Sequence, residues 1–170
     1  VNLISGIVGA WGLNDQISNL GINDQTQYVP YVSPVNVANY NLNSIEGFWP
    51  LAAGPYGSLF LNNGQLHGTG RWVASPNPTS ISQRIGTKSD WVGIAMGDYI
   101  AYIIDASQNL YVVGQDLYGE ACLDNQGTNI AEPTIIPDSN LPPRLSWSTS
   151  RFKSIATGTG FVAFLMQDGN

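Results

Sequence analysis

The sequence predicts an all-β protein made of repeated antiparallel sheets, and three observations support this fold class. Short runs of alternating apolar residues recur along the chain, as in Tyr99 to Ile104 and Leu110 to Val113. Turn residues such as Asn63-Gly64 separate these runs. No segment of useful length has helical periodicity. The chain is therefore interpreted as a series of hairpins that must pack on one another.

The first segment, residues 1–47, is predicted to hold two short strands and a long connection. An apolar strand, a turn at Ser5-Gly6 and a second strand ending at Ala10-Trp11-Gly12 open the segment. Asn-Asp and Leu-Gly pairs between residues 13 and 30 indicate tight turns. The remainder, from Tyr31, is expected to form an extended edge strand and a surface loop.

The second segment, residues 48–90, repeats this unit. Asn63-Gly64 lies between two apolar alternations, and both residues accept the positive φ of a type I′ hairpin turn. Gly70 ends the hairpin, as Gly12 ends the earlier strand. The sequence after Gly70 predicts a shorter exit loop without a Leu-Gly pair.

The third segment, residues 91–151, holds the fullest copy of the unit, and the fourth, residues 152–170, begins another. In the third, Asp105 to Asn109 connects two apolar strands, and a glycine-containing loop leads to a further strand near Ile136. In the fourth, Asp168-Gly169 predicts a turn whose return strand is expected to follow.

Glycines give the register of the repeats. Those that end strands are spaced 58 and 44 residues apart, and those that begin hairpins 43 and 61 apart. The first set is Gly12, Gly70 and Gly114, and the second is Gly54, Gly97 and Gly158. A constant strand core with variable loops, about four strands per repeat, is typical of β-propeller blades. Since propellers usually have about 4 to 8 blades, the roughly three blades predicted here are expected to form an incomplete ring or a segment of a larger propeller.

Composition excludes several classes of function. Charged residues make up 11% of the chain and the net charge is −6, so a nucleic-acid partner is not expected. The apolar runs are too short for a membrane span. Solubility that depends on Asn, Gln, Ser and Thr favours a virion or extracellular setting.

Several stretches share one pattern of glycines, apolar strands and loops. They are LYVVGQDLYGEACLDNQGTNIAEPTII at 110–136, preceded by WVGIAMGDYIAYII, together with PLAAGPYGSLFLNNGQLHGTG, GIVGAWGLNDQISNLGIND and SIATGTGFVAFLMQDG. With these residues the sequence resembles the regulator of chromosome condensation repeat family. The resemblance covers nearly the whole chain and implies a β-propeller, usually seven-bladed, that recognises other proteins. Cys122 departs from the pattern, because it replaces a loop glycine that Gly21 supplies in the first repeat. His67 stands where an aromatic residue is usual.

No catalytic motif, metal motif or cofactor motif is found, so a non-enzymatic protein without cofactors is expected. His67 is the single histidine, and a lone histidine on a strand is usually a packed or surface residue. Cys122 is the single cysteine and is interpreted as a small buried hydrophobe. A loop calcium site at Asp124 and Asn125 lacks the regular Asp-x-Asp spacing.

Aromatic residues are the candidate partner contacts. Those on strands, Trp11, Trp91 and Tyr111, are expected to pack between blades. Those in loops or beside prolines are candidate anchors for a partner; they are Tyr28, Tyr31, Tyr40, Trp72 and Trp147. The sequence therefore predicts a structural platform for protein–protein interaction within a larger assembly, such as a phage tail or attachment apparatus. The alternative is a host-attachment lectin, whose partner is a host surface protein or glycan.

Overall fold

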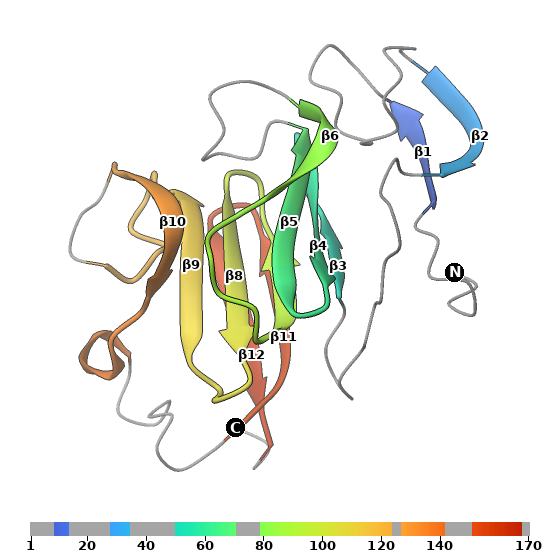
Figure 1. The fold of residues 1–170 in the computed structure, drawn as a ribbon. Helices are drawn as coiled ribbons and strands as arrows, with labels where there is room; N and C mark the ends of the chain where they lie inside the picture. The colour runs from blue at the N-terminus through green and yellow to red at the C-terminus, as the bar shows by residue number, and fades with distance from the viewer. Residues whose placement is uncertain are drawn as a thin grey trace.

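The computed structural model describes residues 9–13, 28–34, 50–70, 79–123, 127–141 and 151–167, with the backbone alone described for 9–13, 28–34 and 79–82. These residues form twelve β-strands and one short 3-10 helix (Figure 1). The strands are β1 (Gly9–Leu13), β2 (Tyr28–Pro34), β3 (Leu51–Ala53), β4 (Gly57–Asn62), β5 (Gln65–Gly70), β6 (Thr79–Arg84), β7 (Trp91–Met96), β8 (Ile100–Asp105), β9 (Leu110–Gln115), β10 (Asn129–Ile135), β11 (Phe152–Gly158) and β12 (Phe161–Met166). The 3-10 helix is Asp138–Asn140.

The strands form four antiparallel sheets that follow one another along the chain. We name them sheet A (β1–β2), sheet B (β3–β4–β5–β6), sheet C (β7–β8–β9–β10) and sheet D (β11–β12). The first strands of the last three sheets contact one another, since β7 touches both β3 and β11. Figure 1 shows the red strands of sheet D behind the yellow strands of sheet C. The predicted all-β fold with antiparallel blades is confirmed.

Strands β7 and β8 of sheet C are buried on both faces, and the core contacts of β8 show why its sequence is apolar. Ile100, Tyr102 and Ile104 belong to the core shared with sheet D. Ala101 and Ile103, which alternate with them, belong to the core shared with sheet B. Because successive side chains of a strand point to opposite faces, a strand between two sheets needs apolar residues at every position.

Trp91 and Tyr111 pack against each other at the core between sheets B and C. Trp91 is 4% exposed and lies in that core, where Tyr111 packs against it. Their rings meet edge to face with centroids 4.8 Å apart. The prediction that these aromatics pack between blades is confirmed. Trp11 lies in β1, but its side chain is outside the described part.

The three hairpin glycines form a ladder through the stack. A Cβ atom on Gly54 would lie 2.7 Å from the carbonyl oxygen of Gly97, and one on Gly97 would lie 3.0 Å from that of Gly158. We call these three residues the glycine ladder. Their backbones approach too closely for a side chain, so the prediction that a side chain here would crowd the neighbouring blade is confirmed for Gly54 and Gly97.

The predicted turns are confirmed where the structure describes them. Asn63 and Gly64 have φ of 50° and 71°, as a type I′ turn requires. Asp105 closes the β8–β9 turn by accepting the Asn109 backbone N–H at 2.8 Å. The turns expected at Ser5-Gly6 and Asp168-Gly169 lie outside the described residues.

Two details differ from the sequence prediction. The fourth strand of sheet B, β6, lies in the segment after Gly70 that was interpreted as a loop, and it pairs with β5. Strand β2 begins at Tyr28, inside the predicted loop, and pairs with β1. In both cases cross-strand pairing overrides a Pro- and Asn-rich sequence that favours turns.

Candidate functional site

One end of the sheet stack carries aromatic side chains on the turns of successive sheets. Tyr56 lies in the β3–β4 turn and Tyr99 in the β7–β8 turn, and their rings stack at 5.1 Å with a 25° interplanar angle. Tyr118, in the β9–β10 loop, is 73% exposed, and its neighbour Leu117 is also exposed. We call Tyr56, Tyr99, Leu117 and Tyr118 the aromatic edge. It is a surface of the kind that anchors a partner.

The aromatic edge continues toward sheet D. A Cβ atom on Gly160, in the β11–β12 turn, would lie 3.7 Å from the Tyr118 ring. The stack of Tyr56 on Tyr99 connects the edges of sheets B and C in the same way. The aromatic edge therefore covers the turns of sheets B and C and borders the β11–β12 turn of sheet D.

Hydrogen bonds hold the loop that presents Tyr118. Buried Asp116 accepts the Ala121 backbone N–H at 3.2 Å, and its own carbonyl accepts that of Gly127 at 2.6 Å. The Glu120 carboxylate accepts the Tyr118 backbone N–H at 2.6 Å. Because the backbone is fixed on both sides of Tyr118, a partner that contacts its ring has little loop entropy to remove.

Tyr102 anchors this loop to the core by a hydrogen bond. Its hydroxyl donates to the Glu120 carbonyl at 2.7 Å. Burial, together with the negative charges of nearby groups, raises the pKa of Tyr102, so the hydroxyl remains a donor at any physiological pH.

Cys122 closes the same loop in a conformation that favours glycine. Its φ is 52°, in the left-handed region, which explains why another repeat has Gly21 at the matching sequence position. The side chain is half-buried and packs against the core between sheets C and D. Burial and the charge of Asp116 raise the pKa of the thiol. These observations agree with the interpretation of Cys122 as a packed residue.

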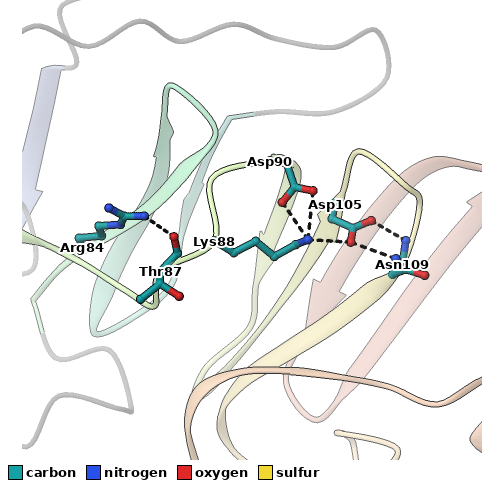
Figure 2. A network of polar contacts seen from close by, with 6 residues as sticks. All are labelled: Arg84, Thr87, Lys88, Asp90, Asp105 and Asn109. Atoms are coloured by element: carbon teal, nitrogen blue, oxygen red, sulfur yellow. Dashed lines mark hydrogen bonds and ion pairs between the residues drawn. The ribbon is translucent and has the colours of Figure 1, made fainter.

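The opposite end of the stack holds a charged cluster around Lys88 (Figure 2). The Lys88 ammonium lies 2.9 Å from Asp90 Oδ1 and 3.2 Å from Asp105 Oδ2. It also lies 5.4 Å from the Trp91 ring centroid and 5.5 Å from that of Tyr111, within cation–π range. The cluster ties the β6–β7 connection to the β8–β9 turn.

Lys88 and Asp105 stabilise each other's charged form. The hydrogen bond to Asp90 is the main cause that raises the pKa of Lys88 to about 12, and the contacts with Asp105 add to it. Burial alone would raise the pKa of Asp105, but hydrogen bonds from Asn109 and Lys88 outweigh it and hold that pKa below its ordinary value. Lys88 and Asp105 therefore stay charged and paired near neutral pH, as in a structural clamp.

His67 is packed, as the sequence analysis expected for a lone histidine. Its ring stacks on Phe60 with centroids 5.8 Å apart and an interplanar angle of 12°. Burial, and then the charge of Arg84, lower the pKa of His67. The imidazole is therefore mainly neutral at pH 7.

The structure places only two of the five predicted partner contacts. Tyr28 and Tyr31 lie in β2, where the backbone alone is described. The other three, Tyr40, Trp72 and Trp147, lie outside the described residues, as do Asp124 and Asn125 of the considered calcium loop. Among the described residues, no group of three or more His, Cys, Asp or Glu side chains could hold a metal ion. In that same part of the chain, no helix has the length and hydropathy of a membrane span.

Sequence reasoning missed the aromatic edge. Tyr56 and Tyr99 each stand two residues after a ladder glycine, so they could have been found from their shared place in the repeat. The exposure of Tyr118 carries no such signal, because it depends on how residues 116–123 fold back on sheet C.

Comparison with solved structures identifies the fold. A crystal structure of human WBSCR16 superposes with a TM-score of 0.72 at 16% identity, covering 96% of this chain and 42% of that one. The crystal structure of Prp20p from Saccharomyces cerevisiae gives 0.74 at 16% identity, with 93% and 39% covered. Yeast RCC1 (Prp20) bound to Kap60 gives 0.73 at 16% identity, with 92% and 37% covered.

The chain has an RCC1-like β-propeller repeat fold. It spans about two fifths of the length of these solved chains, 37% to 42%. Searches against protein-family models and against curated proteins found no match. The predicted resemblance is thus confirmed at the level of three-dimensional structure, although too few residues are shared for recognition by sequence comparison.

Proposed function

We propose that this RCC1-like segment acts as a non-enzymatic protein-interaction platform, with the aromatic edge as its contact surface. The carrying observation is Tyr118, which is 73% exposed on a loop whose backbone is hydrogen-bonded on both sides. Tyrosines on rigid supports contribute large contact areas at low conformational cost. Tyr28, Tyr31, Tyr40, Trp72 and Trp147 are proposed as further contacts.

The similar structures support protein recognition as the role. Prp20p is described with binding properties toward Gsp1p and histones, and yeast RCC1 was crystallised with Kap60. We propose for this chain only the general role, recognition of another protein subunit, since a shared fold does not determine the partner.

The reactive side chains of the described part favour a non-enzymatic role. The Cys122 thiol is half-buried with a raised pKa, and the His67 imidazole is stacked on Phe60. Lys88 is engaged by two carboxylates. Each of these groups has a packing role that accounts for its position.

The test compares a contact variant with a matched control. Tyr118→Ser removes an anchor of the aromatic edge, whereas Ile135→Ser changes an exposed residue of β10 in the same sheet. A protein that copurifies with the wild-type chain would be isolated and titrated against each variant by calorimetry. We expect Tyr118→Ser to weaken binding more than about tenfold and Ile135→Ser less than about twofold. Equal binding by both variants would refute the contact surface.

A glycan-binding role is the second candidate, and the stacked pair of Tyr56 and Tyr99 favours it. Exposed aromatic faces are the surfaces on which sugar rings stack. Saturable binding on a glycan array, lost in Tyr99→Ser or Trp147→Ala, would support a host-attachment lectin. Absence of binding across a broad array would leave the protein platform.

We further propose a virion or extracellular setting, such as a phage tail or attachment apparatus. The support is compositional, since charged residues make up only 11% of the chain. Quantitative proteomics of purified particles, culture medium and cell lysate tests it. Enrichment in particles or medium is expected, and confinement to the lysate would contradict it.

A further inference from the structure

A tyrosine ring stands at the hairpin turn of each of sheets B, C and D. Tyr56 and Tyr99 each come two residues after a ladder glycine, and their rings stack on each other. The equivalent residue after Gly158 is Gly160, which has no side chain, and the Tyr118 ring lies 3.7 Å from where its Cβ would stand. Tyr118 therefore supplies, from the β9–β10 loop, the ring that the β11–β12 turn itself lacks.

Carboxylates accompany these rings. Asp98 is half-buried and directly precedes Tyr99. The half-buried Glu120 carboxylate lies beside Tyr118, because one of its oxygens accepts the Tyr118 backbone N–H at 2.6 Å. Within the described residues, no ion pair engages Asp98 or Glu120. Both carboxylates are therefore available to a cation from a partner.

Asp116 adds a third carboxylate to the loop that carries Tyr118. Its side chain is fully buried, Oδ1 accepts the Ala121 backbone N–H, and Oδ2 has no hydrogen-bond partner among the described residues. Its negative charge acts on Cys122, where it follows burial as a cause of the raised thiol pKa. A charge that is removed from water is weakly screened, so this carboxylate adds to the negative potential of the loop.

The basic side chains of the described part lie elsewhere. Arg84 and Lys88 belong to the polar contacts drawn in Figure 2, which reach the β8–β9 turn. Arg151 and Lys153 lie at the start of β11, the end of that strand away from Gly158. Because carboxylates gather at the aromatic edge and the described cations do not, this edge is a negatively charged surface.

A small apolar pocket lies beside the same rings. Tyr99 lines it together with Leu59 of β4, Met96 of β7 and Val113 of β9, so the pocket is between sheets B and C. No charged side chain lines it, and its size admits only the tip of an aliphatic side chain. Aromatic side chains beside such a pocket are typical of the places where a partner's anchor residue is buried.

Resting on the contact surface proposed above, we propose that the aromatic edge binds an arginine-bearing segment of a protein partner. The guanidinium group stacks on the exposed Tyr118 ring and pairs with Glu120, and Asp98 adds attraction beside Tyr99. An aliphatic neighbour in the segment enters the pocket. Arginine fits better than lysine, because its planar group stacks on aromatic rings and forms paired hydrogen bonds with carboxylates. Charge complementarity carries the choice of a cationic partner over an apolar one.

The probe is a peptide selected without assumptions about its composition. A phage-displayed library of randomised heptapeptides is selected on the immobilised 170-residue chain, after removal of peptides that bind the Tyr118→Ser variant. We expect the selected sequences to contain arginine next to leucine, isoleucine or valine. Acidic sequences, apolar or proline-rich sequences without arginine, or the absence of any selected sequence would each overturn the proposal.

The selected peptide is then compared with a copy in which citrulline, an uncharged isostere, replaces arginine. Fluorescence polarisation should show the citrulline peptide binding the wild type about fivefold or more weakly. Glu120→Gln retains an acceptor for the Tyr118 N–H and should weaken the arginine peptide about threefold, with little effect on the citrulline peptide. Asp98→Asn is the second variant, with the same expectation. Near-UV circular dichroism checks that each variant is folded.

Asp138→Asn is the matched control, because it removes the same charge from an exposed residue of the 3-10 helix after β10. It should change the affinity by less than about 1.5-fold, since the distant charge is screened. Equal binding of the two peptides, or equal losses in Glu120→Gln and Asp138→Asn, would overturn the arginine site.

The outcomes also separate the arginine site from the contact surface on which it lies. A copurified partner that requires Tyr118 but contacts it without an arginine refutes only the arginine site. A copurified partner that binds Tyr118→Ser as tightly as the wild type refutes the contact surface, and the arginine site with it.

Discussion

A methyl group added to the glycine ladder should cost stability, and Gly54 is the sharpest place to measure it. In Gly54→Ala the new Cβ would lie 2.7 Å from the Gly97 carbonyl oxygen and 3.2 Å from two atoms of Met96. The Met96 side chain is able to move. The carbonyl belongs to the backbone of the neighbouring sheet, so relief requires sheets B and C to separate locally.

The expected magnitude follows from two opposing effects. Overpacking a tight site costs about 1 to 3 kcal/mol. Replacing glycine by alanine also restricts the unfolded chain, which stabilises the fold by about 0.4 to 1 kcal/mol. We therefore expect Gly54→Ala to lower the free energy of unfolding by about 0.5 to 2 kcal/mol. Gly97→Ala, whose nearest backbone atom lies at 3.0 Å, should lose less.

Urea denaturation followed by tryptophan fluorescence measures these changes, with linear extrapolation to water. Gly158→Ala provides the contrast, because the three nearest atoms to its Cβ all belong to the Phe161 ring. Phe161→Ala should therefore rescue Gly158→Ala, whereas Met96→Ala should not rescue Gly54→Ala. Wild-type stability of Gly54→Ala, or its rescue by Met96→Ala, would refute the idea that backbone contact between sheets explains these glycines.

Three further predictions concern the charged cluster and the braced loop. Lys88→Met should lower the free energy of unfolding by about 2 to 4 kcal/mol, since Asp105 is 1% exposed and would lose its cationic partner. A loss below about 0.5 kcal/mol in urea denaturation would contradict the clamp. Because the pKa of Asp105 is held below its ordinary value of 3.8, the ionised carboxylate stabilises the fold above that pH, and this stabilisation is lost as the pH falls toward the folded-state pKa. The free energy of unfolding should therefore fall less steeply with decreasing pH in Asp105→Asn than in the wild type. Identical acid dependence in the two proteins would contradict this prediction. Tyr102→Phe should cost about 1 to 3 kcal/mol, because the part-buried Glu120 carbonyl loses its donor. The same substitution should speed hydrogen exchange of the Ala121 amide, and unchanged exchange would show that the hydroxyl does not brace the loop.

Features that depend on neighbouring residues were predictable from the sequence, and features that depend on contacts between distant residues were not. Asn63-Gly64 was predictable because a type I′ turn depends on the φ angles of its two central residues. Strand β8 was predicted from the run Tyr99 to Ile104, but the alternation described there indicates one buried face, whereas both faces of β8 are buried between sheets B and D. Strand β6 was missed, because the Pro- and Asn-containing stretch before it favours turns and its pairing with β5 cannot be read from the sequence.

The candidate surfaces depended more on tertiary structure than the fold did. Aromatics in loops or beside prolines were predicted as contacts. Tyr28 lies in β2 and not in a loop, and Tyr31 lies in β2 within the predicted edge strand. Phe161 and Leu165 have the sequence pattern of core residues in a strand, and in the described structure they are exposed. No local pattern distinguishes an apolar strand position that is covered from one that is exposed.

The sequence by itself determined the repeat, its register and its turns, because strand alternation and glycine placement are local features of short stretches of chain. Tertiary structure alone decided which apolar faces are covered, how the Lys88 cluster assembles and where Tyr118 is presented. Those outcomes require residues tens of positions apart to meet, and their meeting depends on how each sheet stacks on the next.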